Sequence, residues 1–328
     1  MRGRWIELAL LAAMALTAAL ALALGEAALD GRQLAAALTE PSSPAAEIVW
    51  AIRAPRLAAA AAVGAALGLS GAVMQGLLRN PLADPGVLGV SAFAGLGAAL
   101  AIAAGAGSLA GAVEGAALIG ALAAGAAVAA LAARFQEPET LILFGVALAA
   151  FGSAATALVF NLSSSPVTTA EVMAWLLGSV ENRDWPQIGW TAVPMLAGAG
   201  LSAYAGRGLS IMTLGEETAA LSGLPMARLR TAAVAGAALM TGAAVALAGI
   251  IGFVGLAAPH LARSLAGDEP RRILLPSAMI GVVLLVLADV AARLVPTEVQ
   301  LRIGVVTALF GAPLFALAAW RAARSWRG

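Results

Sequence analysis

Long apolar runs alternate with short polar or proline-containing segments along almost the whole chain. An α-helix needs about 20 apolar residues to cross a hydrocarbon layer, so runs of this length predict membrane-spanning helices. The expected spans lie near residues 5–24, 57–78, 90–106, 113–133, 141–160, 187–206, 229–251, 273–294 and 303–320. A further run, 253–265, is interrupted by Pro259 and is too short to cross, so we expect a half-length helix packed inside the bundle. The pattern predicts an all-α polytopic membrane protein in which residues 1–328 form a single transmembrane domain, a ten-helix bundle with one short helix.

The first apolar run fits two interpretations. Arg2 and Arg4 followed by the run 5–24 are compatible with a cleaved signal peptide or with a retained first helix. The run is as long as a full span, and no clear small-residue cleavage site separates it from a soluble domain. We therefore favour a retained helix and keep the signal peptide as the alternative.

Composition excludes several classes of protein. The chain is 61% hydrophobic and 11% charged, whereas soluble domains carry about 25% charged residues, so a lipid bilayer is the expected environment. The net charge of +1 and the lack of a basic stripe give no reason to expect nucleic acid as a partner. Abundant alanine and glycine favour helices that pack closely through small residues, as at Gly64, Gly68 and Gly71.

Several kinds of chemistry are also excluded by residue type. There is no cysteine, so neither a disulfide framework nor a thiolate metal site is expected. A single histidine, His260, excludes a metal site built on two imidazoles within one copy of the chain. All 19 basic residues are arginine, and a Walker A loop needs its lysine to hold the phosphates of ATP. If ATP drives this protein, the hydrolysis takes place on another polypeptide.

The distribution of arginine predicts the orientation in the membrane. With the N-terminus inside, thirteen arginines fall in cytoplasmic segments and six fall outside, namely Arg32, Arg53, Arg56, Arg183, Arg293 and Arg302. Cytoplasmic loops carry the excess of positive charge in membrane proteins, so both termini are expected to be cytoplasmic. The seven tryptophans lie at or near the ends of the expected spans, as indole rings at the membrane interface usually do.

Two polar segments stand out as candidate partner surfaces. The proline-containing turn 79–90 separates two apolar runs. In the segment 214–225, Glu216 and Glu217 stand in the first turn of an expected short helix, where the helix dipole favours carboxylates, and Gly223 followed by proline ends it. We interpret this helix as a rigid lever on the cytoplasmic face; a merely connecting loop is the alternative.

Several separate motifs resemble the FecCD family. They are Gly-Ala-Val-Met-Gln at 71–75, Asn-Pro-Leu-Ala-Asp-Pro-Gly at 80–86, Leu-Gly-Glu at 214–216, Gly-Phe-Val-Gly-Leu at 252–256, Pro-His at 259–260, Gly-Val-Val-Thr-Ala at 304–308 and Gly-Ala-Pro at 311–313. The match covers residues from about 52 to 314, in order and with compatible spacing. Members of this family are permease subunits of type II ABC importers for iron-siderophores, haem and vitamin B12.

The resemblance implies an assembly in the bacterial inner membrane. The permease would pair with a second copy of itself, with two cytoplasmic ABC ATPase subunits that carry ATP and magnesium, and with a periplasmic substrate-binding protein. The chain itself would hold no cofactor and catalyse no reaction. The cargo would be an iron chelate such as a siderophore or haem, or a corrinoid.

The resemblance also implies roles for individual residues. The helix that couples the permease to the ATPase would comprise Leu214, Gly215, Glu216, Glu217, Thr218, Ala219 and Gly223. The cytoplasmic gate would comprise Asn80, Leu82, Glu139 and Thr140, docking of the binding protein would use Arg53, Arg56 and Arg293, and the mouth of the pathway would comprise Met173, Trp175 and Leu176 from an outer helix expected over 168–180. Glu137 and Glu139, Arg302, and Glu269-Pro270 depart from the family pattern.

Two other classes of function remain as alternatives. An ion-coupled secondary transporter would need an intramembrane ionisable group, for which Asp289 is the candidate. Arg293 follows it at i+4, so we expect a local ion pair instead. We expect structural roles for Gln75 and His260 as well. A membrane-embedded enzyme lacks a credible nucleophile–base pair or metal cluster in this sequence.

Overall fold

A computed structural model describes residues 2–25, 27, 29–135, 138–163, 165–213, 215–295 and 301–325. The described residues are helical and contain no strand, which confirms the predicted all-α fold. The long helices are α1 (Arg2–Ala23), α4 (Ala54–Leu77), α5 (Val90–Ala103), α6 (Ala112–Arg134), α7 (Pro138–Leu162), α9 (Trp185–Met212), α11 (Met226–Ala248), α12 (Val254–Ala266), α13 (Pro270–Leu294) and α14 (Ile303–Ser325). Short helices are α2 (Gly31–Thr39), α3 (Pro44–Glu47), α8 (Pro166–Leu176) and α10 (Glu216–Leu221).

The sequence pattern missed α2 and α3, so the predicted count of ten bundle helices with a coupling helix is incomplete. Their signals are local: Asp30 and Gln33 form a capping box at the start of α2, and Ser43 accepts a hydrogen bond from the backbone N–H of Ala46 ahead of α3. A π-helical turn, Ile48–Arg53, then leads into α4. Because these helices are short and lie in a polar stretch, an apolar-run criterion does not detect them.

Length and hydropathy single out six of the described helices as able to cross a membrane. They are Gly3–Ala23, Pro44–Leu77, Ala112–Arg134, Glu139–Leu162, Met226–Ala248 and Pro270–Leu294, with shorter apolar helices at Val90–Ala103 and Ile303–Pro313. The protein is therefore a multi-pass membrane protein. Burial differs widely among these helices. In the most apolar 18-residue stretch of α11, 83% of the residues are buried, whereas in that of α1 11% are buried. Helix α11 is therefore central and α1 is peripheral.

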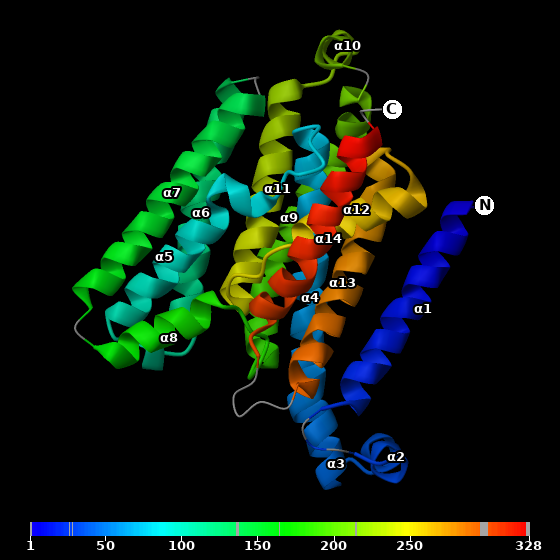
Figure 1. The fold of residues 1–328 in the computed structure, drawn as a ribbon, viewed down its shortest axis with the longest axis vertical. Helices are drawn as coiled ribbons and strands as arrows, with labels where there is room; N and C mark the ends of the chain where they lie inside the picture. Colours follow the sequence, from blue (N-terminus) through cyan, green and yellow to red (C-terminus); the bar gives the residue numbers. More distant parts are fainter. Residues whose placement is uncertain are drawn as a thin grey trace.

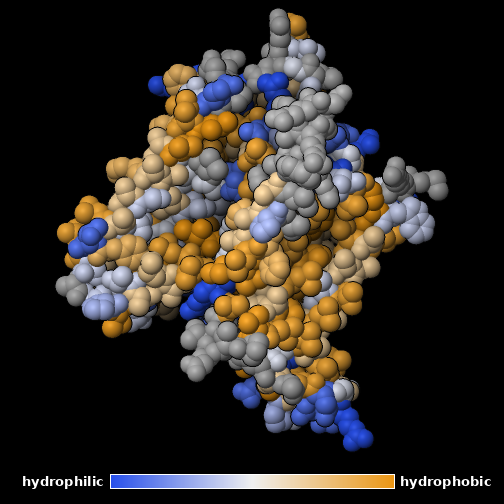
Figure 2. Space-filling model, viewed as in Figure 1, coloured by the Kyte–Doolittle hydropathy of each residue, from blue (hydrophilic) through white to orange (hydrophobic). Residues whose placement is uncertain are grey.

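Figure 1 shows the arrangement. Helices α5, α6, α7 and α8 lie on one side of the central helices α4, α9, α11 and α13, and α1 runs along the opposite side. Helix α10 projects at one end, which we call the α10 end, and α2 and α3 project at the other, which we call the α2 end. Figure 2 shows apolar residues over much of the visible face and hydrophilic residues gathered at the tip formed by α2 and α3.

Small residues let α4 approach α13 and α12 at backbone distance, as predicted. A Cβ atom placed on Gly64 would lie 2.3 Å from the carbonyl oxygen of Gly281, and one on Gly68 would lie 2.2 Å from that of Ser277. A Cβ on Gly71 would lie 1.9 Å from the carbonyl oxygen of Gly255. These positions exclude any side chain, so they set the distance between the helices.

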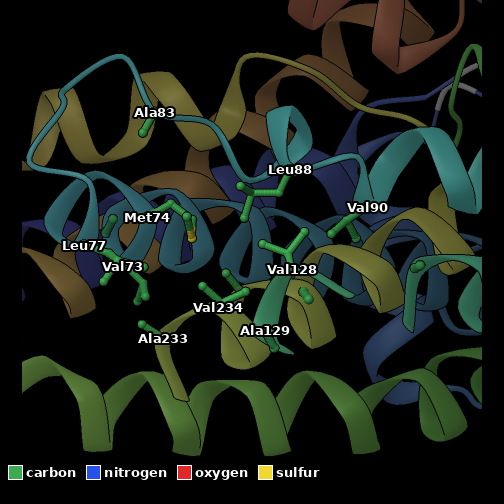
Figure 3. Packing of buried hydrophobic residues seen from close by; sticks show 14 of the residues in the cluster. Val73, Met74, Leu77, Ala83, Leu88, Val90, Val128, Ala129, Ala233 and Val234 are labelled. Carbon is green, nitrogen blue, oxygen red and sulfur yellow. The ribbon is translucent and has the colours of Figure 1, made fainter. Parts of the chain in front are cut away.

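The apolar core joins the two sides of the bundle. Figure 3 shows Val73, Met74 and Leu77 of α4 near Val128 and Ala129 of α6 and near Ala233 and Val234 of α11. Met74 and Val73 are fully buried. Small side chains on α6 and α11 make room for the larger side chains of α4, which gives close packing without a hydrophobic driving force between helices.

Candidate functional site

The connection between α4 and α5, residues 79–89, forms a turn that we call the gate turn. Asn80 Oδ1 accepts a hydrogen bond from the backbone N–H of Leu82 at 2.9 Å, and the backbone N–H of Ala83 donates to the Asn80 carbonyl at 3.1 Å. Asp84 Oδ1 accepts from the backbone N–H of Gly86 at 2.7 Å, which caps the short 3₁₀ turn that follows. Asparagine and aspartate suit such turns because their side chains bond the backbone two residues on.

The gate turn presents the apolar side chain of Leu82 outward. Leu82 is 53% exposed, whereas Ala83 and Leu88, which follow it in the turn, are buried. Figure 3 shows the Leu88 side chain extending toward the α4 residues of the core. The predicted gate residues Asn80 and Leu82 therefore stand on a turn that is anchored at both sides, with Leu82 free to meet another surface.

The gate turn packs against the first turn of α12. A Cβ on Gly255 would lie 3.1 Å from Asp84 Oδ2, and a Cβ on Gly71 of α4 would lie 1.9 Å from the Gly255 carbonyl oxygen. The structure thus joins three of the sequence motifs at Gly255, which sequence spacing did not predict. Burial raises the pKa of the Asp84 carboxyl, while the hydrogen bond from Gly86 acts in the opposite direction.

The other predicted gate residues stand at the start of α7. Glu139 is exposed and Thr140 is half-buried, in the first turn of that helix. The neighbouring Glu137 lies outside the described residues. A Cβ on Gly89, at the end of the gate turn, would lie 2.6 Å from the Leu148 side chain, so the gate turn and α7 are in direct contact. The two predicted parts of the gate therefore belong to elements that touch.

The predicted coupling segment forms α10. Gly215 and Gly223 have positive φ values of 106° and 80°, so they turn the chain into and out of a six-residue helix. Ala219 is buried and Thr218 is exposed, and Leu221 is 84% exposed. The Ser222 hydroxyl donates to the Ala219 carbonyl oxygen at 2.7 Å at the end of the helix. Leu214 lies outside the described residues, and only the backbone of Glu216 and Glu217 is described.

The predicted pathway mouth lies on α8. Met173 is 54% exposed, and Trp175 and Leu176 are half-buried. A Cβ on Gly249, which follows α11, would lie 2.3 Å from the Trp175 carbonyl oxygen, and one on Gly304 in α14 would lie 2.3 Å from that of residue 177. The C-terminal end of α8 is thus fixed by two glycines from distant segments. The φ of 72° at Gly249 explains why that position is glycine.

A polar cavity of about 400 Å³ opens beside α8. Glu114 of α6 and Arg183 form an ion pair across it at 3.1 Å, and Gln187 Nε2 donates to the same carboxylate at 3.3 Å. Arg302, one of the departures from the family pattern, faces Glu181 at 3.6 Å. Sequence reasoning missed Glu114 and Arg183, because the two residues lie 69 positions apart and nothing local to either one indicates the other.

Arg53, a predicted docking residue, holds the end of α1. Its guanidinium donates hydrogen bonds to the carbonyl oxygens of Leu22, Ala23 and Ala27 at 2.7, 2.8 and 2.5 Å. The last carbonyls of a helix have no partner within the helix, so these bonds satisfy groups that would otherwise lack one. Arg53 is 5% exposed, which leaves little of its side chain at the surface.

Arg56 and Arg293, the other predicted docking residues, share one carboxylate. Asp289 Oδ1 lies 2.9 Å from Arg56 and Oδ2 lies 2.9 Å from Arg293, and Asp289 is 1% exposed. Arg293 also donates to the carbonyl oxygens of Ala21 and Leu24, both at 3.2 Å. The predicted ion pair between Asp289 and Arg293 is confirmed, but its second partner, Arg56, was missed. We call Arg53, Arg56, Asp289 and Arg293 the outer charge cluster.

Comparison with known proteins places the chain among transporters. Residues 12–321 match the model of the FecCD transport family. The chain is 41% identical over 276 residues to the vitamin B12 import system permease protein BtuC of Escherichia coli O127:H6, covering 83% of this chain and 84% of that protein. It is 40% identical over 286 residues to the ABC transporter permease protein YvrB of Bacillus subtilis, covering 85% and 80%.

Solved structures agree with this placement. A metal-chelate type ABC transporter in an inward-facing conformation superposes with a TM-score of 0.86 at 29% identity, covering 96% of this chain and 98% of the other. PsaBC from Streptococcus pneumoniae superposes with a TM-score of 0.52 at 16% identity and shares the fold alone, over 87% and 94% of the two chains. With the gate turn, α10 and the short helix α12 in the places that its motifs predicted, this chain belongs to the FecCD transport family.

Proposed function

We propose that this chain is the permease subunit of an ABC importer that moves a corrinoid or another metal chelate, such as an iron-siderophore or haem, into the cytoplasm. Its relatives include a vitamin B12 permease and a metal-chelate type transporter. The observation that carries the proposal is α10, which projects beyond the bundle between two turn-forming glycines and exposes Leu221 (Figure 1). A short, rigid helix with an exposed apolar side chain suits insertion into a cleft of another protein.

The proposed assembly contains two copies of this chain, two ATPase subunits at the α10 end and a binding protein at the α2 end. ATP and magnesium act on the ATPase subunits, since this chain has no lysine for a Walker A loop. The α10 end is then cytoplasmic in the bacterial inner membrane, with both termini inside. The excess of arginine in the segments at this end supports that orientation.

We expect the packing of α9, α11 and α4 to carry a movement of α10 to the gate turn. Helix α10 lies between α9 and α11, which pack closely on one another and on α4. The gate turn is held against α12 through Gly255 and against α7 through Gly89. Closely packed elements transmit small displacements to one another because protein interiors have low compressibility. Movement of α10 by the ATPase is therefore expected to displace the gate turn and expose or cover Leu82.

The proposed mouth at α8 suits a bulky cargo. Met173 offers a large, exposed apolar surface without a charged group, and Trp175 and Leu176 line the same helix. A transport route must bind its cargo weakly enough for release at every step. Selectivity then resides mainly in the binding protein. The predicted docking of that protein at Arg53, Arg56 and Arg293 requires it to compete with, or to add to, the contacts that these arginines already make.

Reconstitution with the cognate ATPase and binding protein tests this function. We expect uptake of a corrinoid or iron chelate into proteoliposomes that depends on ATP and on the binding protein. Uptake by this chain alone, driven by a proton or sodium gradient, would instead establish an ion-coupled secondary transporter. Asp289, the candidate ion site, argues against that alternative, because two arginines already neutralise its carboxylate.

A further inference from the structure

A cavity of about 530 Å³ lies between the N-terminal part of α1 and the connection from α12 to α13. It belongs to the α10 end of the protein and is separate from the gate turn, α8 and the outer charge cluster. Its walls come from the first two turns of α1, the last turn of α12 and the first two turns of α13. We call it the basic pocket, because three arginines and a single carboxylate line it.

Two of these arginines have no carboxylate bound to them among the described residues. Arg272 is already paired with Glu269, at 2.5 Å. Arg263 interacts electrostatically with Asp268 but forms no ion pair with a described carboxylate. Its buried Nη1 atom has no hydrogen-bond partner in the described part of the chain. A buried guanidinium nitrogen without a partner is costly, which points to an acceptor that completes the site.

Arg271 has no ion pair with a described carboxylate either, and its side chain is exposed. The backbone N–H of Arg271 donates to the Ser210 hydroxyl at 3.3 Å, which fixes the base of this side chain against α9. Arg263 and Arg271 thus line the same cavity from two elements, one partly buried and one at the surface. Guanidinium groups bind phosphate oxygens through paired hydrogen bonds, so two of them lining one cavity favour a phosphate group as its occupant.

Apolar side chains make up much of the remaining lining of the pocket. Leu265 and Leu275 line it and are 47% and 57% exposed, and Ile6 faces them from α1. Helix α1 is attached to the bundle at its other end by Arg53 and Arg293, and Figure 1 shows it standing apart from α12 and α13 toward its N-terminus. A gap between two membrane helices with apolar walls accommodates an acyl chain.

We propose that the basic pocket binds an anionic phospholipid, with its phosphate group on Arg263 and Arg271 and an acyl chain along Leu265 and Leu275. Basic pockets between membrane helices bind anionic head groups in this way. Glu7, the one carboxylate in the lining, disfavours a second negative charge on its side of the pocket, so a singly charged head group such as phosphatidylglycerol fits. The site depends only on the chain being a membrane protein and not on its cargo.

Lipid titration of the purified full-length chain in detergent tests the proposal. Native mass spectrometry would compare phosphatidylglycerol with phosphatidylcholine of the same acyl chains. We expect preferential binding of phosphatidylglycerol, weakened about fivefold in Arg271→Gln and about 25-fold in the Arg263→Gln, Arg271→Gln double variant, since each arginine near a membrane surface contributes about 1 kcal/mol. Arg207→Gln with Arg228→Gln is the matched control, because both residues are exposed at the same end and lie outside the pocket; it should bind as the wild type does.

Three outcomes would overturn the proposal. Equal binding of the two lipids would show that the head-group charge is not recognised. Displacement of phosphatidylglycerol by inorganic phosphate at similar concentration would show a free-anion site with no part for the acyl chain. Retained lipid binding in the double variant, together with lost co-purification of the ATPase subunit, would assign the arginines to a protein interface instead. The single variant Arg271→Gln keeps the test valid if the double variant does not fold, because its side chain is exposed.

Discussion

At the α2 end, one carboxylate and five backbone carbonyl groups of residues 21–27 surround the three arginines of the outer charge cluster, and the charged side chains are buried. At the α10 end, the gate turn and α10 expose Leu82 and Leu221, and the buried Nη1 atom of Arg263 lacks a hydrogen-bond partner among the described residues. The outer charge cluster satisfies its charged groups within the chain, whereas the gate turn, α10 and the basic pocket leave apolar and cationic groups without such contacts. This difference fits the proposed assembly, in which the outer charge cluster anchors α1 and the α10 end is completed by partners.

Removing the shared carboxylate is expected to cause the largest loss of stability. Asp289→Asn leaves Arg56 and Arg293 buried without a counter-charge, and breaking a buried ion pair in this way costs about 3–5 kcal/mol. A large fall in the Tm of the purified chain would be the readout. Glu47→Gln, which alters an exposed carboxylate at the same end, is the control and should leave Tm unchanged. A Tm for Asp289→Asn close to that of wild type would mean that the cluster does not anchor this end.

Gly71→Ala is expected to cause the next largest loss, lowering the free energy of unfolding by about 3 kcal/mol. The added methyl would lie 1.9 Å from the Gly255 carbonyl oxygen and would force α4 away from α12, a case of overpacking. Gly252→Ala is a suitable control because nothing lies within 4 Å of the added atom. Thermal unfolding measures the loss, and ATP-driven uptake should fall with it since the gate turn rests on the same contact. Normal uptake by a stable Gly71→Ala protein would refute the rigid link between α4, α12 and the gate turn.

Arg53→Gln should destabilise the attachment of α1 by about 2 kcal/mol. The variant removes hydrogen bonds from the Arg53 guanidinium to backbone carbonyl oxygens, and each hydrogen bond from a charged donor contributes about 1.5–3 kcal/mol. Water that reaches these carbonyl groups in the variant offsets part of the loss. Proteolysis in the segment after α1 should become faster than in the wild type, while Arg32→Gln on α2, whose side chain is exposed, should not change the rate. An unchanged rate for Arg53→Gln would show that other contacts hold α1.

Asn80→Ala is expected to cost about 1 kcal/mol, because it removes the acceptor for the backbone N–H of Leu82. Since the turn is anchored independently by Asp84 and Gly86, the chain should remain folded. Transport should be affected more than stability, as a looser turn holds Leu82 less firmly. A small drop in Tm with a several-fold drop in ATP-driven uptake would fit this expectation, and intact uptake would contradict it.

Leu221→Asp should have the smallest effect on stability and the clearest effect on assembly. Leu221 is 84% exposed, so its replacement should change the free energy of unfolding by no more than about 0.5 kcal/mol. A carboxylate on the exposed side of α10 should nevertheless prevent the ATPase subunit from co-purifying. Thr218→Asp introduces the same charge at another exposed position of α10. Comparing the two variants shows whether co-purification of the ATPase subunit depends on the apolar side chain of Leu221. Continued co-purification in Leu221→Asp would remove α10 from the proposed interface.

The sequence by itself determined the class of this protein and the places of most of its helices. A membrane helix satisfies its backbone hydrogen bonds within one segment, so local hydropathy suffices to find it. The half-length helix near 253–265 was found because Pro259 and the shortness of the run are local features too. Hydropathy did not predict α2 and α3, because both helices are short and lie in a polar stretch, and their signal in the sequence is their capping residues.

Only the tertiary structure decided which polar groups meet. Arg56 and Asp289 are 233 positions apart, and their pairing depends on how α4 and α13 cross. The burial of Arg53 against the end of α1, the position of Gly255 between α4 and the gate turn, and the assembly of the basic pocket from α1, α12 and α13 have the same origin. Contacts between helices are set by the relative positions of whole helices. Small residues at helical spacing, such as Gly64, Gly68 and Gly71, show which face packs closely but do not show which distant helix packs against it.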